Sequence, residues 1–217
     1  MIEMPQDVYI IYEKLKNEVN WLYVKWKIYR QLYDQGQKRV DLLNQSAALF
    51  FYVIEQSLMS EISIFVSKLT DPARKGRFEN LSLYQLQERI EKHCDSVFVS
   101  SSCEFLKAVE KRCEPLRKWR DKKLAHLDLG VAMNNGVVKL PDFSREEIGG
   151  SISAISDYLN NIEGHYNDSY HAYENMVIHT DANELVAMLR YGARYEELRD
   201  EGKIEISDWT LGYWRDA

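Results

Sequence analysis

The segment Arg120-Asp121-Lys122-Lys123-Leu124-Ala125-His126 holds the residue types that metal-free cleavage of RNA requires. The imidazole of His126 titrates near neutrality, so it can take the proton from a ribose 2′-hydroxyl or return one to the departing 5′-oxygen. The guanidinium of Arg120 can hold a phosphate through two parallel hydrogen bonds. An arginine six residues before a histidine is common in helical proteins, so the spacing by itself does not assign this chemistry.

The position of Arg120 on its predicted helix is unusual for an arginine. Leu116, Arg120 and Leu124 follow each other in steps of four, so Arg120 projects from the edge of an apolar face. On a straight helix His126 lies about 120° around from Arg120. The two side chains would therefore meet only if the helix ends there or if a second copy of the protein contributes one of them.

Charge is distributed unevenly along the chain. The formal net charge of −6 argues against a protein that binds polyanions nonspecifically over its whole surface. Between Lys107 and Lys123, however, eight basic residues face only three acidic ones. We expect this stretch to contact an RNA backbone, with Arg117, Lys122 and Lys123 as the substrate-binding residues.

Apolar residues recur every three or four positions over most of the chain, which predicts an all-α fold. The 217 residues, 45% of them hydrophobic, suffice for one domain with a sizeable core. We predict an antiparallel helical bundle with long amphipathic helices, in which residues 1–200 form the helical domain. Helices are expected over residues 7–34, 40–69, 82–94, 102–126, 144–178 and 181–199.

Local signals indicate where some of these helices begin and end. Residues 70–77 hold a proline and a glycine and are expected to form a loop. Ser101 or Ser102 is expected to cap the helix that carries the Arg-His motif. Pro115 lies inside that helix, so we expect a kink or a restart there.

The chain after the motif shows a different pattern. Asn134-Asn135-Gly136 lies between β-prone runs and predicts a small β-hairpin insertion. Ser144 and Glu147 have the spacing of a capping box that opens the next helix. We expect the aromatic tail, residues 201–217, to pack on the domain, with a docking surface for a partner as the alternative. Its aromatic residues are Trp209, Tyr213 and Trp214.

The segment from Arg120 to His126 resembles the signature of the HEPN superfamily. In that signature an arginine is followed by a polar residue and then, after four to six intervening positions, by a histidine. Five residues lie between Arg120 and His126. The long amphipathic helices before the motif are also similar to that superfamily. The form RDKKLAHLD is most similar to its abortive-infection subgroup, which occurs in prokaryotic phage-defence and toxin-antitoxin systems.

The resemblance implies a helical bundle that forms a homodimer and brings two motifs into one cleft as a metal-independent endoribonuclease. It implies that Arg120 binds the scissile phosphate, that His126 is acid or base, and that Asp121 takes the polar position, which is often asparagine in the family. It further implies RNA as substrate, no cofactor, no metal, and an antitoxin or defence-system partner. The alternative is a noncatalytic helical domain that binds a nucleotide or serves as a scaffold.

Other candidate sites carry weaker signals. His165 and His171 lie six apart, which does not point two imidazoles at one metal, and His93 beside Cys94 lacks further ligands. The sequence contains no glycine-rich phosphate loop, no G-x-S-x-G and no H-E-x-x-H motif. Several aromatic residues could stack on bases, although most follow the expected core stripe. They are Trp21, Tyr23, Trp26, Tyr29 and Tyr33.

The cysteines and the N-terminal residues indicate the cellular compartment in which the protein is expected. Cys94, Cys103 and Cys113 are an odd number without a C-x-x-C pair, so we expect three reduced thiols. The N-terminal residues lack the charged and apolar blocks of a secretion signal, and no stretch of about 18 uninterrupted apolar residues occurs. We therefore expect a cytoplasmic protein with no membrane segment.

Overall fold

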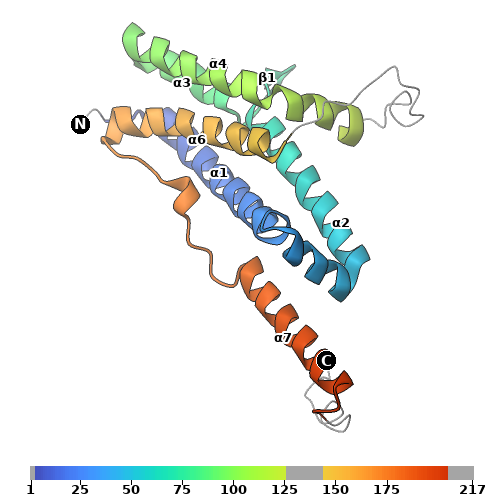
Figure 1. Cartoon of the computed structure of the whole chain (residues 1–217). Helices are drawn as coiled ribbons and strands as arrows, with labels where there is room; N and C mark the ends of the chain where they lie inside the picture. Colours follow the sequence, from blue (N-terminus) through green and yellow to red (C-terminus); the bar gives the residue numbers. More distant parts are fainter. Residues whose placement is uncertain (1–2, 126–143, 205–217) are drawn as a thin grey trace. The chain divides into compact units, whose positions relative to one another are not determined.

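The computed structural model describes residues 3–125 and 144–204, and within them the fold is all-α, as predicted (Figure 1). The chain divides into two compact units. The first comprises residues Met1–Lys27 and Ser57–Val177, and the second comprises Ile28–Gln56 and Ile178–Ala217. The first two helices, α1 (Gln6–Tyr33) and α2 (Gln37–Leu69), each run from one unit into the other.

The first unit is an antiparallel bundle. The beginning of α1 and the end of α2 are joined there by α3 (Leu83–His93), α4 (Ser96–Trp119) and α6 (Arg145–Asn167). α4 and α6 pack against each other along their length and run in opposite directions (Figure 1). The core is apolar and draws on every one of these helices. Among its fully buried members are Leu15, Val19, Leu22, Ile62, Val66, Leu86, Ile90, Cys113, Ile155 and Leu159.

The helix starts in this unit follow ordinary capping chemistry. The Ser82 hydroxyl accepts a hydrogen bond from the Gln85 amide at the start of α3, and the Asp95 carboxylate accepts from Val97 and Phe98 at the start of α4. The predicted cap of α4 at Ser101 or Ser102 is therefore wrong, because Asp95 caps the helix earlier. Ser102 lies inside α4, where its hydroxyl donates to the Val99 carbonyl.

The predicted capping box at the start of α6 is confirmed. The Glu147 amide donates to the Ser144 hydroxyl at 3.2 Å, and the Ser144 amide donates to the Glu147 carboxylate at 2.7 Å. The helix ends at Asn167, however, and not near residue 178 as predicted. Asp168 adopts the left-handed conformation, φ +47°, and Asn160 then holds the backbone of His171 through two hydrogen bonds of 2.9 and 3.1 Å.

Two further features differ from the sequence-based expectations. The predicted loop at 70–77 contains half of a two-stranded antiparallel hairpin, β1 (Arg74–Lys75) and β2 (Phe78–Glu79). α4 also continues through Pro115 without restarting. The hairpin predicted at Asn134–Gly136 and the aromatic tail from residue 205 onward lie outside the described residues.

The second unit contains the end of α1, the beginning of α2 and α7 (Ala182–Asp200). Its small core includes Tyr29, Leu32 and Tyr33, and the Tyr33 hydroxyl donates to the Phe51 carbonyl at 2.7 Å. The helix predicted over residues 181–199 is thus confirmed to within one residue at each end, and the Asp181 side chain caps its start by accepting a hydrogen bond from the Asn183 amide. α2 has non-helical backbone angles at Ala47, so two helical stretches meet there.

Length and composition single out α2 among the helices that the structure describes. It is the one helix there long and apolar enough to cross a bilayer, and 22% of its most apolar window is buried. The core helices of globular proteins satisfy the same criteria. The finding therefore does not assign a membrane to this chain.

Candidate active site at Arg120

Arg120 lies where α4 changes into a π-helix, η1 (Arg120–Ala125). Its side chain is 23% exposed, and the preceding residue on the same line, Leu116, is fully buried. The prediction that Arg120 projects from the edge of an apolar face is thus confirmed. π-Helical turns are rare and occur frequently at functional sites.

Two carboxylates hold the Arg120 guanidinium. Asp121 Oδ1 lies 2.9 Å from Arg120 Nε, and Asp71 Oδ1 lies 3.5 Å from an Arg120 Nη. Asp71 follows the end of α2, so this contact joins α2 to the start of η1. A phosphate that binds Arg120 would have to replace these carboxylates, both of which keep access to water because their side chains are 31% and 61% exposed.

The predicted partner of Arg120, His126, lies outside the described residues. The structure therefore gives no Arg-His distance, and the side chain of Lys123 is likewise not described. Lys122, another predicted substrate-binding residue, lies in η1 and is half-buried. Within the described part of the chain, Asp71 is the residue that the structure adds to the predicted set.

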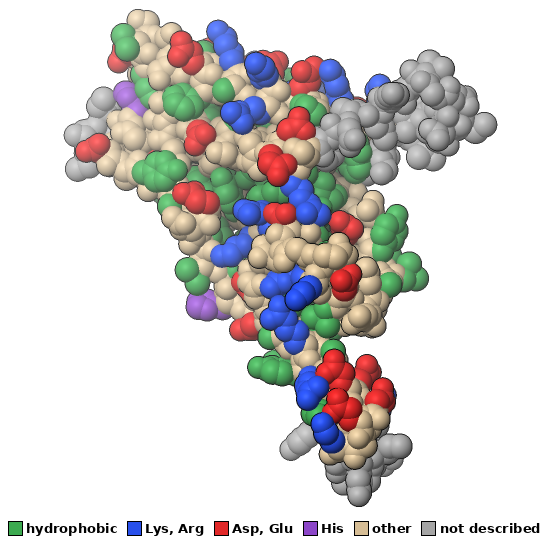
Figure 2. All heavy atoms as spheres, viewed as in Figure 1, with side chains coloured by type: hydrophobic (Ala, Val, Ile, Leu, Met, Phe, Trp, Pro, Cys, Tyr) green, Lys and Arg blue, Asp and Glu red, His purple; other side chains and the backbone are tan. Residues whose placement is uncertain are grey.

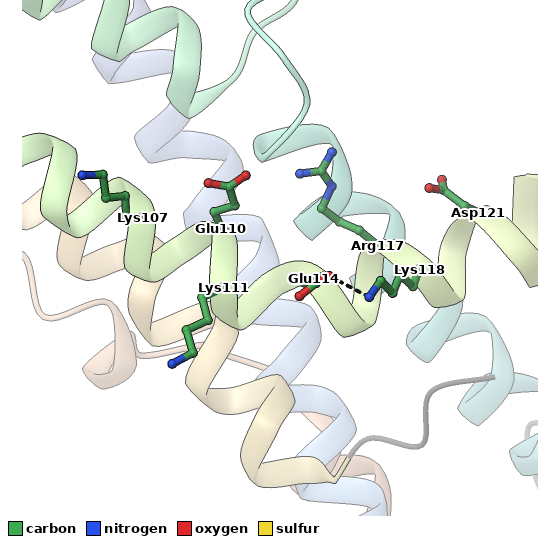
Figure 3. Close-up of a pocket in the computed structure, with 7 residues that line it drawn as sticks. All are labelled: Lys107, Glu110, Lys111, Glu114, Arg117, Lys118 and Asp121. Carbon is green, nitrogen blue, oxygen red and sulfur yellow. Dashed lines mark ion pairs between the residues drawn. The ribbon is translucent and has the colours of Figure 1, made fainter. Parts of the chain in front are cut away.

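Upstream of Arg120, one face of α4 is rich in charge and borders a shallow hollow of about 540 Å³ (Figure 3). We call this surface the α4 basic face. Glu114 and Lys118 form an ion pair across it at 2.6 Å, which holds the pKa of Glu114 below its usual value. In the space-filling view, blue and red side chains are interspersed over the top of the molecule, where α4 lies in Figure 1 (Figure 2). The basic side chains of the face are Lys107, Lys111, Arg117 and Lys118.

The comparison with known families identifies the chain. The sequence model of the family HEPN_AbiU2, described as AbiU2, matches residues 7–185. The chain belongs to the HEPN AbiU2 family. It is thus a HEPN-like protein of an abortive-infection family, as its motif and helix pattern predicted. No curated protein and no solved structure matches the chain.

The other histidines of this HEPN AbiU2 chain have structural neighbours. His165 stacks on Phe98 with ring centroids 3.7 Å apart, and the rings of His171 and Tyr173 form a T-shaped contact. His93 lies 3.0 Å from an Asp7 carboxylate oxygen, which lowers the Asp7 pKa against the effect of its burial. Within residues 3–125 and 144–204, no group of three histidine, cysteine or acidic side chains could hold a metal ion.

The three cysteines of the HEPN AbiU2 chain are free thiols, as predicted. Cys94 lies 2.9 Å from the Tyr166 hydroxyl, and Cys103 donates weakly to Glu91. Cys113 is fully buried against α6, and this burial raises the pKa of its thiol to about 12. Cys94 and Cys103 are half-buried, so reagents can reach them more easily than Cys113.

The aromatic residues of α1 mostly pack inside the protein. Trp26, Tyr29 and Tyr33 are buried, and Tyr23 is half-buried with its ring stacked on Tyr173. Trp21 alone among the five candidates is largely exposed, at 54%. Of the predicted stacking residues in this HEPN AbiU2 chain, only Trp21 is therefore available to a base.

The role of Asp71 could not be inferred from the sequence of this HEPN AbiU2 chain. Its neighbours Thr70 and Pro72 are typical of a loop, so the sequence predicts a loop over the whole segment. The one available signal was its position directly after a long amphipathic helix. That position does not predict that the Asp71 carboxylate pairs with Arg120, which lies 49 residues further along the chain.

Proposed function

We propose that this HEPN AbiU2 protein is a metal-independent endoribonuclease of a prokaryotic defence or toxin-antitoxin system. We place its active site in the cleft of a homodimer, to which each copy contributes Arg120 and His126. The observation that carries the proposal is the placement of Arg120: it is half-buried, oriented by two carboxylates, and located at the end of the α4 basic face. Membership of an abortive-infection family supports the same assignment.

The proposed reaction is a transesterification within the RNA. The 2′-oxygen attacks the adjacent phosphorus while one His126 takes the 2′-hydroxyl proton, and the bond from phosphorus to the 5′-oxygen breaks. The second His126 gives a proton to that 5′-oxygen, so the products are a 2′,3′-cyclic phosphate and a 5′-hydroxyl. General acid-base help of this kind contributes roughly 10²–10⁴ in rate.

Arg120 has the electrostatic role in this proposal. Charge builds up on the nonbridging phosphate oxygens in the transition state, and a guanidinium at that point stabilises it through two parallel hydrogen bonds. Asp71 and Asp121 hold the side chain in place before RNA arrives. Asp121 occupies the polar position of the motif, and its exposed carboxylate can turn away when phosphate binds.

The RNA backbone would follow the α4 basic face towards Arg120. Phosphate contacts fix the register of a nucleic acid without reading its sequence. Arg117 lies about one helical turn before Arg120, so it can reach a phosphate next to the scissile one. Lys122 belongs to the proposed substrate-binding set as a neighbour of Arg120 on η1. Lys123 completes the proposed substrate-binding set.

A second function is favoured by one observation, which is the neutralisation of Arg120. The guanidinium lies within 4 Å of two carboxylates, so part of its charge is already balanced and less of it is available to stabilise the charge that develops in a transition state. The second hypothesis is a noncatalytic HEPN-like domain that binds a nucleotide phosphate or holds a partner protein, such as an antitoxin.

The test is cleavage of a mixed RNA pool in EDTA by wild type and by Arg120→Ala and His126→Ala. We expect wild type to leave 2′,3′-cyclic phosphate ends, and both variants to lose at least about 10²-fold in rate. Arg190→Ala and His179→Ala serve as matched controls, because both residues are exposed and lie outside the motif. These two variants should cleave as wild type does.

The opposite results would assign the second function. If wild type cleaves none of a broad set of RNAs while remaining a dimer in solution, the ribonuclease proposal fails. A labelled RNA that still binds wild type and loses affinity in Arg120→Ala would then identify a nucleotide-binding module. Cleavage that persists in His126→Ala would instead point to a contaminating nuclease.

A further inference from the structure

A small hollow lies beside Asp71 at the end of α2, within the first unit. It has a volume of about 250 Å³ and opens between the middle of α1, the last turns of α2 and the chain just after β2. Sites for whole small molecules usually have about 300–1,000 Å³, so this hollow has room for one ring system such as a nucleobase. We call it the α2-end hollow. Asp71 lines it and also pairs with Arg120, so the hollow adjoins the proposed cleavage site.

Part of the lining of the α2-end hollow is apolar. Leu69 is buried, the ring of Phe65 is half-buried, and Leu81 keeps 40% of its surface exposed. Such a lining favours a flat ring, because burying the ring removes apolar surface from water and lets it pack on an aromatic side chain. Proteins that bind single-stranded RNA commonly hold unpaired bases in this way and read their edges through hydrogen bonds.

The charges of the lining favour a ligand that donates hydrogen bonds over one that is an anion. Glu18 and Asp71 supply two carboxylates, and Lys68 supplies one ammonium group. Asp71 already pairs with Arg120, whereas half-buried Glu18 has no hydrogen bond or ion pair within the part of the chain that the structure describes. A carboxylate accepts hydrogen bonds and donates none. Glu18 therefore presents two oxygens that call for donors on the ligand.

The other polar groups of the lining restrict the ligand further. The Lys68 ammonium lies 5.8 Å from the centre of the Phe65 ring, and no carboxylate of the described residues lies within ion-pair distance of it. It can therefore donate to an oxygen on the ligand. The Asn80 side chain donates to the Pro72 carbonyl at 2.7 Å, which orients it and leaves its amide oxygen as a further acceptor. The hollow thus combines several acceptors with one cationic donor.

We propose that the α2-end hollow binds a guanine base of the RNA. Guanine presents two adjacent donors on one edge, N1–H and the N2 amino group, with the acceptor O6 beside them, whereas adenine, cytosine and uracil each present a single donor group there. The two donors bind the Glu18 carboxylate, O6 accepts from Lys68, and the ring packs on Phe65. The inference rests on the proposed function and deepens it: the guanosine lies next to the phosphate at Arg120, so cleavage occurs preferentially beside guanosine.

The test is fluorescence anisotropy with short 2′-O-methyl oligoribonucleotides, which cannot be cleaved because the 2′-oxygen is blocked. Three probes carry guanine, hypoxanthine or adenine at the centre of an otherwise all-uridine sequence. Hypoxanthine keeps the N1–H and O6 of guanine and lacks only the N2 amino group. We expect the guanine probe to bind about tenfold more tightly than the adenine probe, with the hypoxanthine probe between them, because a carboxylate left without a donor disfavours the complex.

A matched pair of variants assigns the preference to Glu18. Glu18→Gln keeps the size of the side chain but replaces one acceptor with a donor, so the preference for guanine over adenine should fall to about twofold or less. Glu13→Gln removes the same charge from α1 at a position outside the hollow, and it should keep the wild-type preference. Removing a negative charge strengthens the binding of every oligonucleotide, so the quantity compared is the ratio of the two affinities.

Three results would overturn the proposal: equal affinities for the three probes, a guanine preference that survives in Glu18→Gln, or no binding of any probe. Cleavage of unmodified RNA is measured separately, which keeps the two proposals distinguishable. A guanine preference that depends on Glu18, without any cleavage, refutes the ribonuclease alone. Cleavage without enrichment of guanosine beside the cut refutes the guanine site alone.

Discussion

Arg120 lies at a point where carboxylates and phosphate compete for one guanidinium. Asp71 and Asp121 differ in how firmly they are placed: Asp71 is 31% exposed and lies at the end of α2, whereas Asp121 is 61% exposed on η1. A side chain that water reaches freely can leave an ion pair at little cost. Asp71 is therefore the carboxylate that limits how strongly Arg120 binds a phosphate.

We predict that Asp71→Asn tightens RNA binding. The substitution keeps the shape of the side chain and removes its charge, and a partly exposed ion pair is worth up to about 1 kcal/mol, or roughly fivefold in affinity. The measurement is fluorescence anisotropy with a 2′-O-methyl RNA, which cannot be cleaved. Asp34→Asn, which removes the charge of a carboxylate paired with Arg30 in the second unit, is the control. Weaker binding by Asp71→Asn would mean that the carboxylate positions Arg120 instead of competing for it.

The start of α6 is stabilised by the capping box that Ser144 forms with Glu147. The capping box satisfies two backbone amides that would otherwise lack partners, those of Ser144 and Glu147. α6 also supplies one whole side of the first unit, including the carbonyl of Ser151 behind the Cys113 thiol. Fraying at its start would therefore loosen the packing of α4.

We predict that Ser144→Ala destabilises the protein by about 1 kcal/mol, the usual cost of losing a serine cap. For a chain of this size the melting temperature should fall by roughly 2–4 °C. Ser153→Ala is the control, because Ser153 is exposed inside the same helix and alanine is a good helix former. An unchanged melting temperature for Ser144→Ala would show that tertiary packing alone holds the start of α6.

The same contrast between local and distant chemistry explains which elements the sequence could predict. Apolar spacing and the Ser144-Glu147 pattern are local, so α1, α2 and the start of α6 could be located in advance. The end of α6 could not, because Asn160 selects the non-helical path by binding the backbone of His171. Apolar residues continue beyond Asn167 at spacings that a helix would also accept.

In the candidate site, too, features that depend on local spacing could be predicted, whereas features that depend on packing between helices could not. The edge position of Arg120 follows from its spacing to Leu116, and this was predicted correctly. Its contact with Asp71 was not, because a pairing between residues 49 positions apart depends on how α2 and α4 pack. The π-helical turn at Arg120 was missed as well, since the same residues are compatible with a continued α-helix.

Across the described part of the molecule, the helices differ widely in how many buried side chains they contribute. α6 has twelve buried residues, whereas α7 has two, Ala182 and Val186, both near its start. The apolar side chains of Leu185, Met188 and Tyr191 on α7 are exposed. The free energy of local opening is lowest where few apolar contacts are lost. We therefore expect this free energy to be lower for α7 than for α6.

We predict that amide hydrogen exchange at residues 187–200 is faster than in α6 by at least about 10²-fold, because opening α7 beyond Val186 exposes almost no additional core. Exchange measured by mass spectrometry at two protein concentrations tests this. Residues 83–93 of α3, which carry five buried side chains, serve as the internal reference for a well-packed helix. If α7 instead exchanges as slowly as α3 at both concentrations, contacts beyond those of Ala182 and Val186 hold it in place.

If the protection of α7 appears only at the higher concentration, a second copy covers its exposed apolar side chains. Leu185→Glu and Met188→Glu should then each abolish that protection without affecting α6.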